Sequence, residues 1–235
     1  MDQGSHQLTA GVSPLIRWED SRVPQDPYVA HDHDPSVAHD HDLSISHDHA
    51  HSPATGLLAG ASARIARPND ASAVGLVQAA VWRAAYGAVL PQEVIDRFDA
   101  SSFAGVWRDS LTTPPSPRHV LLVSCTGEQV VGFAAVGPSI DRDAAETSGE
   151  MLALGVHPNA RRSGHGSRLL NAAVDTLRDK GFSSMCVWLL ARDEDTRVFL
   201  TAAGLSPDGA YRDRVIDDGR TLAREVRLTA DLSLD

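Results

Sequence analysis

A short basic segment with two glycines has the residue types that bind phosphate. It reads Arg161-Arg162-Ser163-Gly164-His165-Gly166-Ser167 and follows an apolar stretch that ends at Val156. The glycines let the backbone turn tightly, so successive N–H groups can converge on an anion at the start of a helix. The two arginines add full positive charges. Glycine spacing alone also fits a dinucleotide-binding turn or an ordinary tight turn, so the surrounding elements must decide.

Hydrophobic periodicity and turn residues predict the elements that position this loop. A strand over 150–156 leads into it, and a helix over 164–180 follows it and is ended by Gly181. Further strands are predicted at 64–67, 119–125, 129–136, 184–190, 211–216 and 221–228, and helical segments at 69–86, 91–98, 102–111 and 193–203. This alternation of strands and helices predicts the α/β fold class.

Motifs along the chain resemble one family. The frame R-x-x-G-x-G after a strand resembles the acetyl-CoA-binding motif of the GNAT (N-acetyltransferase) superfamily. Residues 81–91 are similar to the first helix of many bacterial members, and 181–190 and 199–205 to the fifth strand and fourth helix. The resemblance covers about residues 63–232 and implies the GNAT acyl-CoA N-acyltransferase fold. That fold is a mixed, mostly antiparallel sheet, splayed between its fourth and fifth strands and flanked by helices.

The resemblance also implies a reaction and a set of site residues. The reaction is transfer of acetyl from acetyl-CoA to a primary amine by direct attack, with no metal required. Backbone groups of Leu154 and Val156 would hold the pantetheine arm and the thioester carbonyl, and the loop residues would hold the pyrophosphate. These loop residues are Arg161, Arg162, Ser163, Gly164, His165, Gly166 and Ser167.

Three further residues have both a functional and a structural interpretation. Glu150 stands where many relatives place the carboxylate that deprotonates the amine, but a solvated charge at a strand end is equally consistent with its position. Trp82 and Tyr86 match a region that lines the acceptor cleft in relatives. Aromatic residues at helical spacing more often belong to a hydrophobic core.

The chain departs from the family pattern in its fourth helix. Relatives usually have Phe-Tyr there, with the tyrosine hydroxyl as an acid near the coenzyme sulfur, whereas this chain has Phe199-Leu200. Asp193 replaces an asparagine at the start of that helix and can still cap it. Because leucine donates no proton, a second reading remains open: an acyl-CoA-binding sensor or scaffold with little or no catalysis.

The first 60 residues differ in composition from the rest. Residues 29–52 contain three octapeptide repeats with seven histidines interleaved with aspartates. Such a segment has too little apolar surface to offset the entropy of ordering, so we predict a disordered, low-complexity tail over 1–60 and a folded GNAT domain over 61–235. The repeats could alternatively bind divalent metal ions such as zinc, nickel or copper.

Charge and cysteine usage limit the partners. Residues 1–60 contribute −7 of the net charge of −10, so neither part has the basic surplus that nucleic acid requires. No stretch predicts a membrane span or a signal peptide, which favours the cytoplasm, and the cysteine spacing predicts two reduced thiols. A small-molecule or peptide amine is expected as acceptor, and a monomer or homodimer as the assembly. Acids near the fourth strand weakly favour a cationic amine; they are Asp141, Asp143, Glu146 and Glu150.

Overall fold

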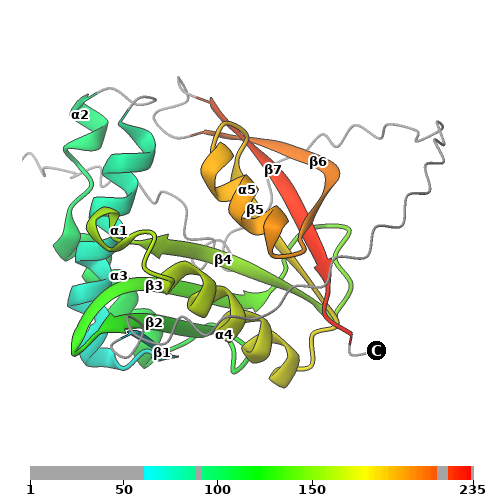
Figure 1. Cartoon of the computed structure of the whole chain (residues 1–235), viewed down its shortest axis with the longest axis horizontal. Coiled ribbons are helices and arrows are strands. Elements are labelled where there is room, and N and C mark those ends of the chain that lie inside the picture. The colour runs from blue at the N-terminus through cyan, green and yellow to red at the C-terminus, as the bar shows by residue number, and fades with distance from the viewer. Residues whose placement is uncertain (1–60, 88–91, 216–221, 234–235) are drawn as a thin grey trace, which may run out of the picture.

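A computed structural model describes residues 61–87, 92–215 and 222–233. Seven strands form one sheet in the order β1-β2-β3-β4-β5-β7-β6 (Figure 1). The strands are β1 Ala61–Ile65, β2 Val120–Thr126, β3 Gln129–Pro138, β4 Ser148–Val156, β5 Ser184–Leu190, β6 Ser206–Val215 and β7 Leu222–Asp231. All neighbouring pairs are antiparallel except β4 and β5, which are parallel. The mixed, mostly antiparallel sheet inferred from the sequence is confirmed.

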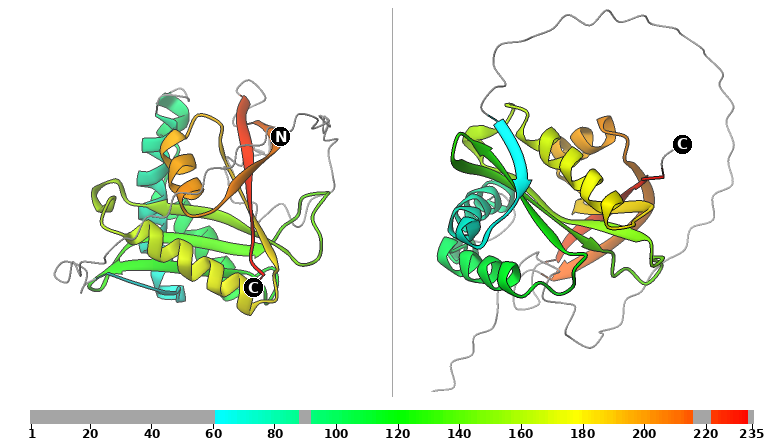
Figure 2. Two further views of the ribbon diagram at one scale, coloured as in Figure 1. Left: turned by 45° about the vertical axis from the view of Figure 1, so that its right-hand side comes forward. Right: turned by 90° about the horizontal axis from the view of Figure 1, so that it is seen from below.

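Helices cover both faces of the sheet (Figure 2). The first face carries α1 Ala71–Tyr86, α2 Gln92–Ile95 and α3 Ala100–Thr112, and the second carries α4 His165–Asp179 and α5 Glu194–Ala202. Among the described residues, no helix is both long and apolar enough to cross a bilayer. The predicted tail and its repeats at 29–52 lie outside the described residues, as does Pro91, where the second helix was expected to begin.

The apolar side chains form two core clusters, one on each face of the sheet. Phe133 and Ala135 of β3 belong to the cluster under α1 and α3, whereas Ala134 and Val136 belong to the cluster under α4 and α5. This alternation follows from the period of two along a strand, since successive side chains point to opposite faces. Strand β3 is therefore a shared wall of both cores.

The sheet divides where β4 meets β5. Parallel pairing covers only Ser148 with Ser184, Gly149 with Met185, and Glu150 with Cys186. Beyond Glu150, β4 continues beside β3, while β5 continues beside β7. The register of β4 against β3 shifts between Met151 and Ala153, which places a bulge at Leu152. We call the divergence after Glu150 and Cys186 the β4–β5 fork.

Helix α4 is fixed at its first residue by a buried side chain. His165 is buried, with its Nδ1 2.5 Å from Ser124 Oγ and its Nε2 3.1 Å from Thr126 Oγ1, both on β2. These contacts tie the N-terminus of α4 to the sheet. Burial lowers the pKa of His165, and the nearby Arg168 charge lowers it further.

Element boundaries differ from the sequence prediction mainly at the edges of the sheet. The first strand is Ala61–Ile65 rather than 64–67, because it pairs with β2 through residues too small to give a hydrophobic pattern. Strand β6 begins at Ser206, not at Tyr211, because an edge strand accommodates Pro207 and Gly209 within a register shift. Helix α3 begins at Ala100, before the expected residue 102, since Asp99 caps it by accepting from Ser102 N at 2.8 Å.

Gly75 of α1 provides a test of the packing between α1 and α3. A Cβ at this position would lie 2.4 Å from the carbonyl oxygen of Ala100 and 2.7 Å from Ala104 N, so the helices would have to separate. We expect Gly75→Ala to lower the free energy of unfolding by about 1–3 kcal/mol despite the better helix propensity of alanine. The control is Gly105→Ala on α3, where a Cβ meets nothing within 4 Å and where we expect about 0.5–1 kcal/mol of stabilisation. Thermal unfolding of both variants decides, and a stabilised Gly75→Ala would contradict the packing described.

The lowered pKa of His165 predicts a pH dependence of stability. Below the unfolded-state pKa of about 6.5 the unfolded chain binds a proton that the folded ring resists, so stability is complete above this pH and is lost as the pH falls through it. We expect the free energy of unfolding of the wild type to fall more, between about pH 8 and about pH 5.5, than that of His165→Asn. The other titrating groups are the same in both proteins and cancel in the comparison. Parallel pH profiles would show that His165 is not the anchor.

Candidate active site

A cavity of about 150 Å³ lies at the β4–β5 fork. Its walls come from both diverging strands and from the helices on either side. The lining residues include Gln78, Trp82 and Tyr86 of α1, Glu150–Leu154 of β4, Val187–Leu190 of β5, Thr196 and Leu200 of α5, Arg212 of β6 and Glu225 of β7. Strands that diverge inside a sheet thus create the space, and both helical layers close it.

Strand β4 offers an open edge to this space. Its residues after Glu150 pair with β3 on one side only, because β5 has turned away. Leu154 lines the cavity, whereas Val156 is half-buried at the strand's end, outside the lining. An edge of this kind has backbone N–H and C=O groups that an extended ligand can pair with, as an added strand does.

The loop after β4 is shaped for an anion. Arg162 has φ 63° and Gly164 has φ 79°, and no side chain caps α4 at Gly164. Left-handed residues next to a helix N-terminus turn successive N–H groups toward one point, and the first N–H groups of a helix have no partner within it. The amides of residues 164–167 are therefore available to an anion.

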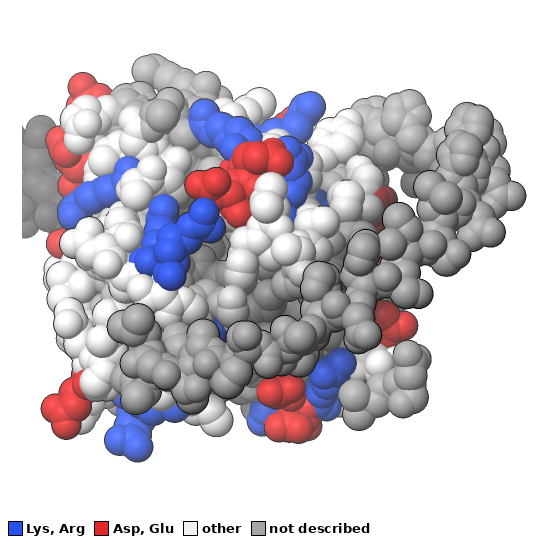
Figure 3. All heavy atoms as spheres, in the orientation of Figure 1, with Lys and Arg blue, Asp and Glu red and all other residues white. Residues whose placement is uncertain are grey.

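The predicted loop residues contribute in different ways. Arg161, Arg162, Ser163 and Ser167 have exposed side chains, whereas the ring of His165 faces the sheet, so only its backbone can face the loop. Figure 3 shows basic side chains gathered on the face where α4 begins. Positive charge and open amides therefore coincide at the end of β4.

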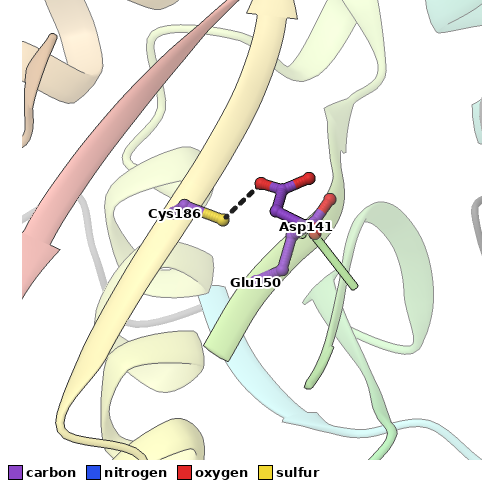
Figure 4. Close-up of side chains that lie close together, drawn as sticks. All are labelled: Asp141, Glu150 and Cys186. Carbon is purple, nitrogen blue, oxygen red and sulfur yellow. Dashed lines mark hydrogen bonds between the residues drawn. The ribbon is translucent and has the colours of Figure 1, made fainter. Parts of the chain in front are cut away.

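Glu150 lies at the base of the fork and is buried at 2% exposure. Figure 4 shows it beside Asp141 and Cys186, and the three side chains bring potential ligand atoms within 4.8 Å of one another. Ser139 donates to Glu150 Oε2 at 3.4 Å. The interpretation of Glu150 as a solvated strand-end charge is therefore wrong, because β5 and the loop after β3 cover it.

Cys186 lies at the fork and has a side chain that can act as a nucleophile, but its environment keeps the thiol protonated. Its Sγ lies 3.6 Å from Ser139 Oγ and 3.9 Å from Asp141 Oδ2. Burial raises the pKa of the Cys186 thiol to about 12, and the charge of Glu150 adds to the effect. The thiol therefore stays protonated at neutral pH and is a poor nucleophile. Cys125 is also buried and free, as expected.

Arg227 of β7 gathers three aspartates around the fork. It contacts Asp141 Oδ2 at 3.1 Å, Asp143 Oδ2 at 2.6 Å and Asp208 Oδ2 at 2.7 Å. These bonds raise the pKa of Arg227 above its usual value, Asp143 contributing most. A preference for a cationic amine, which the acids near the fourth strand suggested, stays a prediction, but these acids are not equivalent in the structure. Arg227 balances Asp141 and Asp143, and only Glu150 of that set lines the cavity.

A second ion pair, which sequence reasoning missed, forms the far wall. Arg212 and Glu225 are both buried, with Arg212 Nε 2.5 Å from Glu225 Oε2. The guanidinium of Arg212 stacks on the ring of Trp188 at 4.1 Å, and the indole N–H of Trp188 donates to Asp141 Oδ2 at 2.9 Å. The alternation of charged and apolar residues along β7 was the only signal of this pair in the sequence.

The two aromatic residues of α1 belong to the core and also border the cavity. Trp82 packs edge-to-face against Phe98 and Phe103, and Tyr86 against Phe98. Both are less than 10% exposed and both line the cavity. The core interpretation is therefore confirmed, and because both residues also line the cavity, the acceptor role stays a prediction.

Helix α5 closes the cavity without a hydroxyl at its key position. Leu200 is fully buried in the second core cluster and also lines the cavity. Asp193 caps the helix by accepting from Thr196 N at 3.1 Å, as the sequence predicted. Leu200 therefore contributes an apolar side chain without a hydroxyl to the cavity wall.

Comparison with known proteins gives relatives and structural neighbours. The YuaI protein of Bacillus subtilis strain 168, described as an uncharacterized N-acetyltransferase, is 27% identical over 130 residues, which are 55% of this chain and 72% of YuaI. The structure of yncA from Salmonella typhimurium with its cofactor acetyl-CoA has a TM-score of 0.55 at 20% identity, covering 75% of this chain and 96% of that one. The PaiA N-acetyltransferase of Thermoplasma acidophilum in complex with coenzyme A has a TM-score of 0.52 at 15% identity, covering 70% and 97%.

At these identities the two solved structures show the fold alone. The family assignment comes from the sequence. The model of the acetyltransferase (GNAT) family matches residues 77–199, which span the chain from α1 through the glycine loop to α5. Because this match covers more than half of the 235 residues, the chain belongs to the GNAT family of acetyltransferases.

Proposed function

We propose that this protein is an acetyl-CoA-dependent N-acetyltransferase that transfers acetyl to a primary amine by direct attack. The observation that carries the proposal is the cavity at the fork, which joins an open strand edge to a buried carboxylate, Glu150. Relatives named N-acetyltransferases and neighbours solved with acetyl-CoA or coenzyme A support it. The function is inferred from the residues of the site rather than from the fold, because one fold hosts many functions.

The residues present fit the coenzyme. The backbone amides of residues 164–167 would bind the pyrophosphate, and Arg161 and Arg162 would add charge beside it. The edge of β4 at Leu154 and Val156 would bind the pantetheine arm. Bound acetyl-CoA supplies a thioester, whose thiolate leaves readily at neutral pH.

The transfer step follows from these positions. The amine nitrogen attacks the thioester carbon, a C–N bond forms, the C–S bond breaks, and the sulfur leaves as the thiolate of coenzyme A. The proton lost by the nitrogen passes to Glu150, directly or through water, and then to the thiolate or to solvent. The products are an amide and coenzyme A. Cys186 takes no part, because its raised pKa keeps it a thiol.

The charge of the cavity favours a cationic acceptor. Glu150, Asp193 and Glu225 line it against a single arginine, Arg212. An ammonium group is attracted to such a site, whereas an acidic acceptor is repelled. The acceptor would be a small-molecule or peptide amine. Trp82 and Tyr86 would flank the part of it that bears the amine.

A second candidate function is an acyl-CoA sensor or scaffold. The observation that favours it is Leu200, which leaves α5 without a hydroxyl acid where the coenzyme sulfur would lie. Turnover separates the two candidates. Release of free thiol with any amine of a small-molecule and peptide panel supports the enzyme, whereas coenzyme binding without release across the panel supports the sensor.

Gly164 provides the test of the pyrophosphate site. Valine at φ 79° is strained and blocks the approach of backbone to phosphate. We expect acetyl-CoA at about a hundred times its Kd to stabilise the wild type by about 2.7 kcal/mol, and Gly164→Val to lose this stabilisation. Thermal shift measures both proteins.

The matched control for strain is Gly181→Val. Gly181 also has a left-handed φ, of 80°, and lies just after α4, at the end opposite the loop. Both variants lose stability, but only Gly164→Val should lose the response to acetyl-CoA. An equal thermal shift in Gly164→Val and in the wild type would remove the loop from the coenzyme site.

Glu150 provides the test of the base. Glu150→Gln keeps the shape of the side chain but removes the proton acceptor, so we expect kcat to fall by about 10²–10⁴-fold with an unchanged Kd for acetyl-CoA. Thiol release gives kcat, and calorimetry gives Kd. The control is Glu146→Gln, an exposed acid of the loop before β4, which should leave turnover as in the wild type. Wild-type turnover in Glu150→Gln would assign proton removal to another group.

A further inference from the structure

Gln78 places an amide group in the wall of the cavity. Its side chain is 1% exposed, and its neighbours on the same side of α1, such as Val74 and Val81, are apolar. Within the described residues, its Nε2 has no hydrogen-bond partner. A buried N–H group without a partner is unfavourable, so such a group in a cavity wall points to a ligand that completes it.

The orientation of this amide is fixed by Trp107 of α3. The indole N–H of Trp107 donates to Gln78 Oε1 at 2.6 Å. Because an indole N–H can only donate, the amide oxygen must face Trp107 and the amide NH₂ must face away from it. The end of Gln78 that is left without a partner is therefore a hydrogen-bond donor.

Of the atoms that react, only the carbonyl oxygen of the thioester can accept a hydrogen bond from Gln78 Nε2 in a way that assists the transfer. A protonated amine has donors only, and a neutral amine needs its lone pair for the attack. The thioester sulfur is a weak acceptor. The carbonyl oxygen accepts hydrogen bonds in the ground state and gains negative charge as the nitrogen attacks.

Helix α1 is in contact with the strand that would hold the thioester. A Cβ added at Gly155 of β4 would lie 3.3 Å from Val81 Cγ2, one turn along α1 from Gln78. Gln78 also shares the cavity wall with Leu152–Leu154 at the bulge of β4. The donor and the open strand edge thus border the same space of about 150 Å³.

We propose that Gln78 Nε2 donates a hydrogen bond to the carbonyl oxygen of the acetyl thioester and stabilises the charge that develops there during transfer. This inference rests on the proposed acetyl-CoA-dependent function. It assigns Gln78 a role at the reacting atoms, so the residue discriminates acetyl-CoA from free coenzyme A, which lacks that oxygen.

The test compares the affinities of acetyl-CoA and coenzyme A by calorimetry. Gln78→Met removes the donor at nearly constant side-chain length. We expect the Kd of acetyl-CoA to rise by about three- to tenfold, while the Kd of coenzyme A stays unchanged. The rate of acetyl transfer to an amine or to water should fall by about a hundredfold at saturating acetyl-CoA. Release of the coenzyme A thiol measures this rate.

Two further variants separate this role from packing. Val77→Ala changes a buried neighbour on α1 outside the cavity lining, and it should lower the melting temperature without altering the ratio of the two affinities. Should Gln78→Met unfold, the double variant with Trp107→Phe removes both partners of their hydrogen bond together, and the same ratio is measured.

The outcomes distinguish this inference from the function on which it rests. A wild type that binds neither acetyl-CoA nor coenzyme A overturns both. A wild type that binds both, with an affinity ratio that Gln78→Met leaves unchanged, overturns the role of Gln78 alone. A variant that weakens both ligands equally does the same, because a merely structural residue would act in that way.

Discussion

The structure depends on one constraint: the parallel pairing of β4 and β5 ends after three residue pairs. A strand edge inside a folded protein needs hydrogen-bond partners, and beyond Glu150 the edge of β4 has no strand beside it. The positions of the other parts of the site follow from this divergence of β4 and β5. The bulge at Leu152 redirects β4, β5 follows β7 instead, and Leu200 and Trp82 close the gap from opposite faces.

Ion pairs organise the environment of the fork. Arg227 holds the loop after β3 against β6 and β7 through three aspartates, and Arg212 is paired with Glu225 under Trp188. A buried pair of this kind adds little net stability, because desolvation offsets the attraction, but it fixes geometry. The effect here is that the acids around Glu150 are matched with arginines. Beside Glu150, the Ser139 hydroxyl donates a hydrogen bond to its carboxylate, and the thiol of Cys186 is held in its neutral form.

Local patterns in the sequence predicted most of the fold. The strand at 184–190 and the helix after Gly164 were located almost to the residue, because alternation and helical spacing are properties of neighbours in sequence. The edge strands were placed less well, since β1 and β6 owe their extent to pairing partners that are distant in sequence. The family resemblance pointed to Glu150, but only the covering strand and loop show that it is buried.

The charged walls of the cavity lay beyond the reach of sequence patterns. Asp141 and Asp143 looked like free charges until the structure placed Arg227 beside them, 86 and 84 residues further along the chain. Gln78 looked like an ordinary polar residue of α1. Its role is inferred from Trp107, which lies 29 residues away and fixes which end of the amide is left without a partner.

The position of β3 between the two core clusters has a consequence for how the molecule opens. Phe133 and Ala135 belong to one core, and Ala134 and Val136 to the other, so neither core can be exposed without disturbing this strand. Its backbone amides, hydrogen-bonded to β2 and β4, are released only when both halves of the domain come apart. In hydrogen exchange, β3 should therefore exchange last and report the global free energy of unfolding, while β6, bonded on one side only, exchanges through smaller local openings.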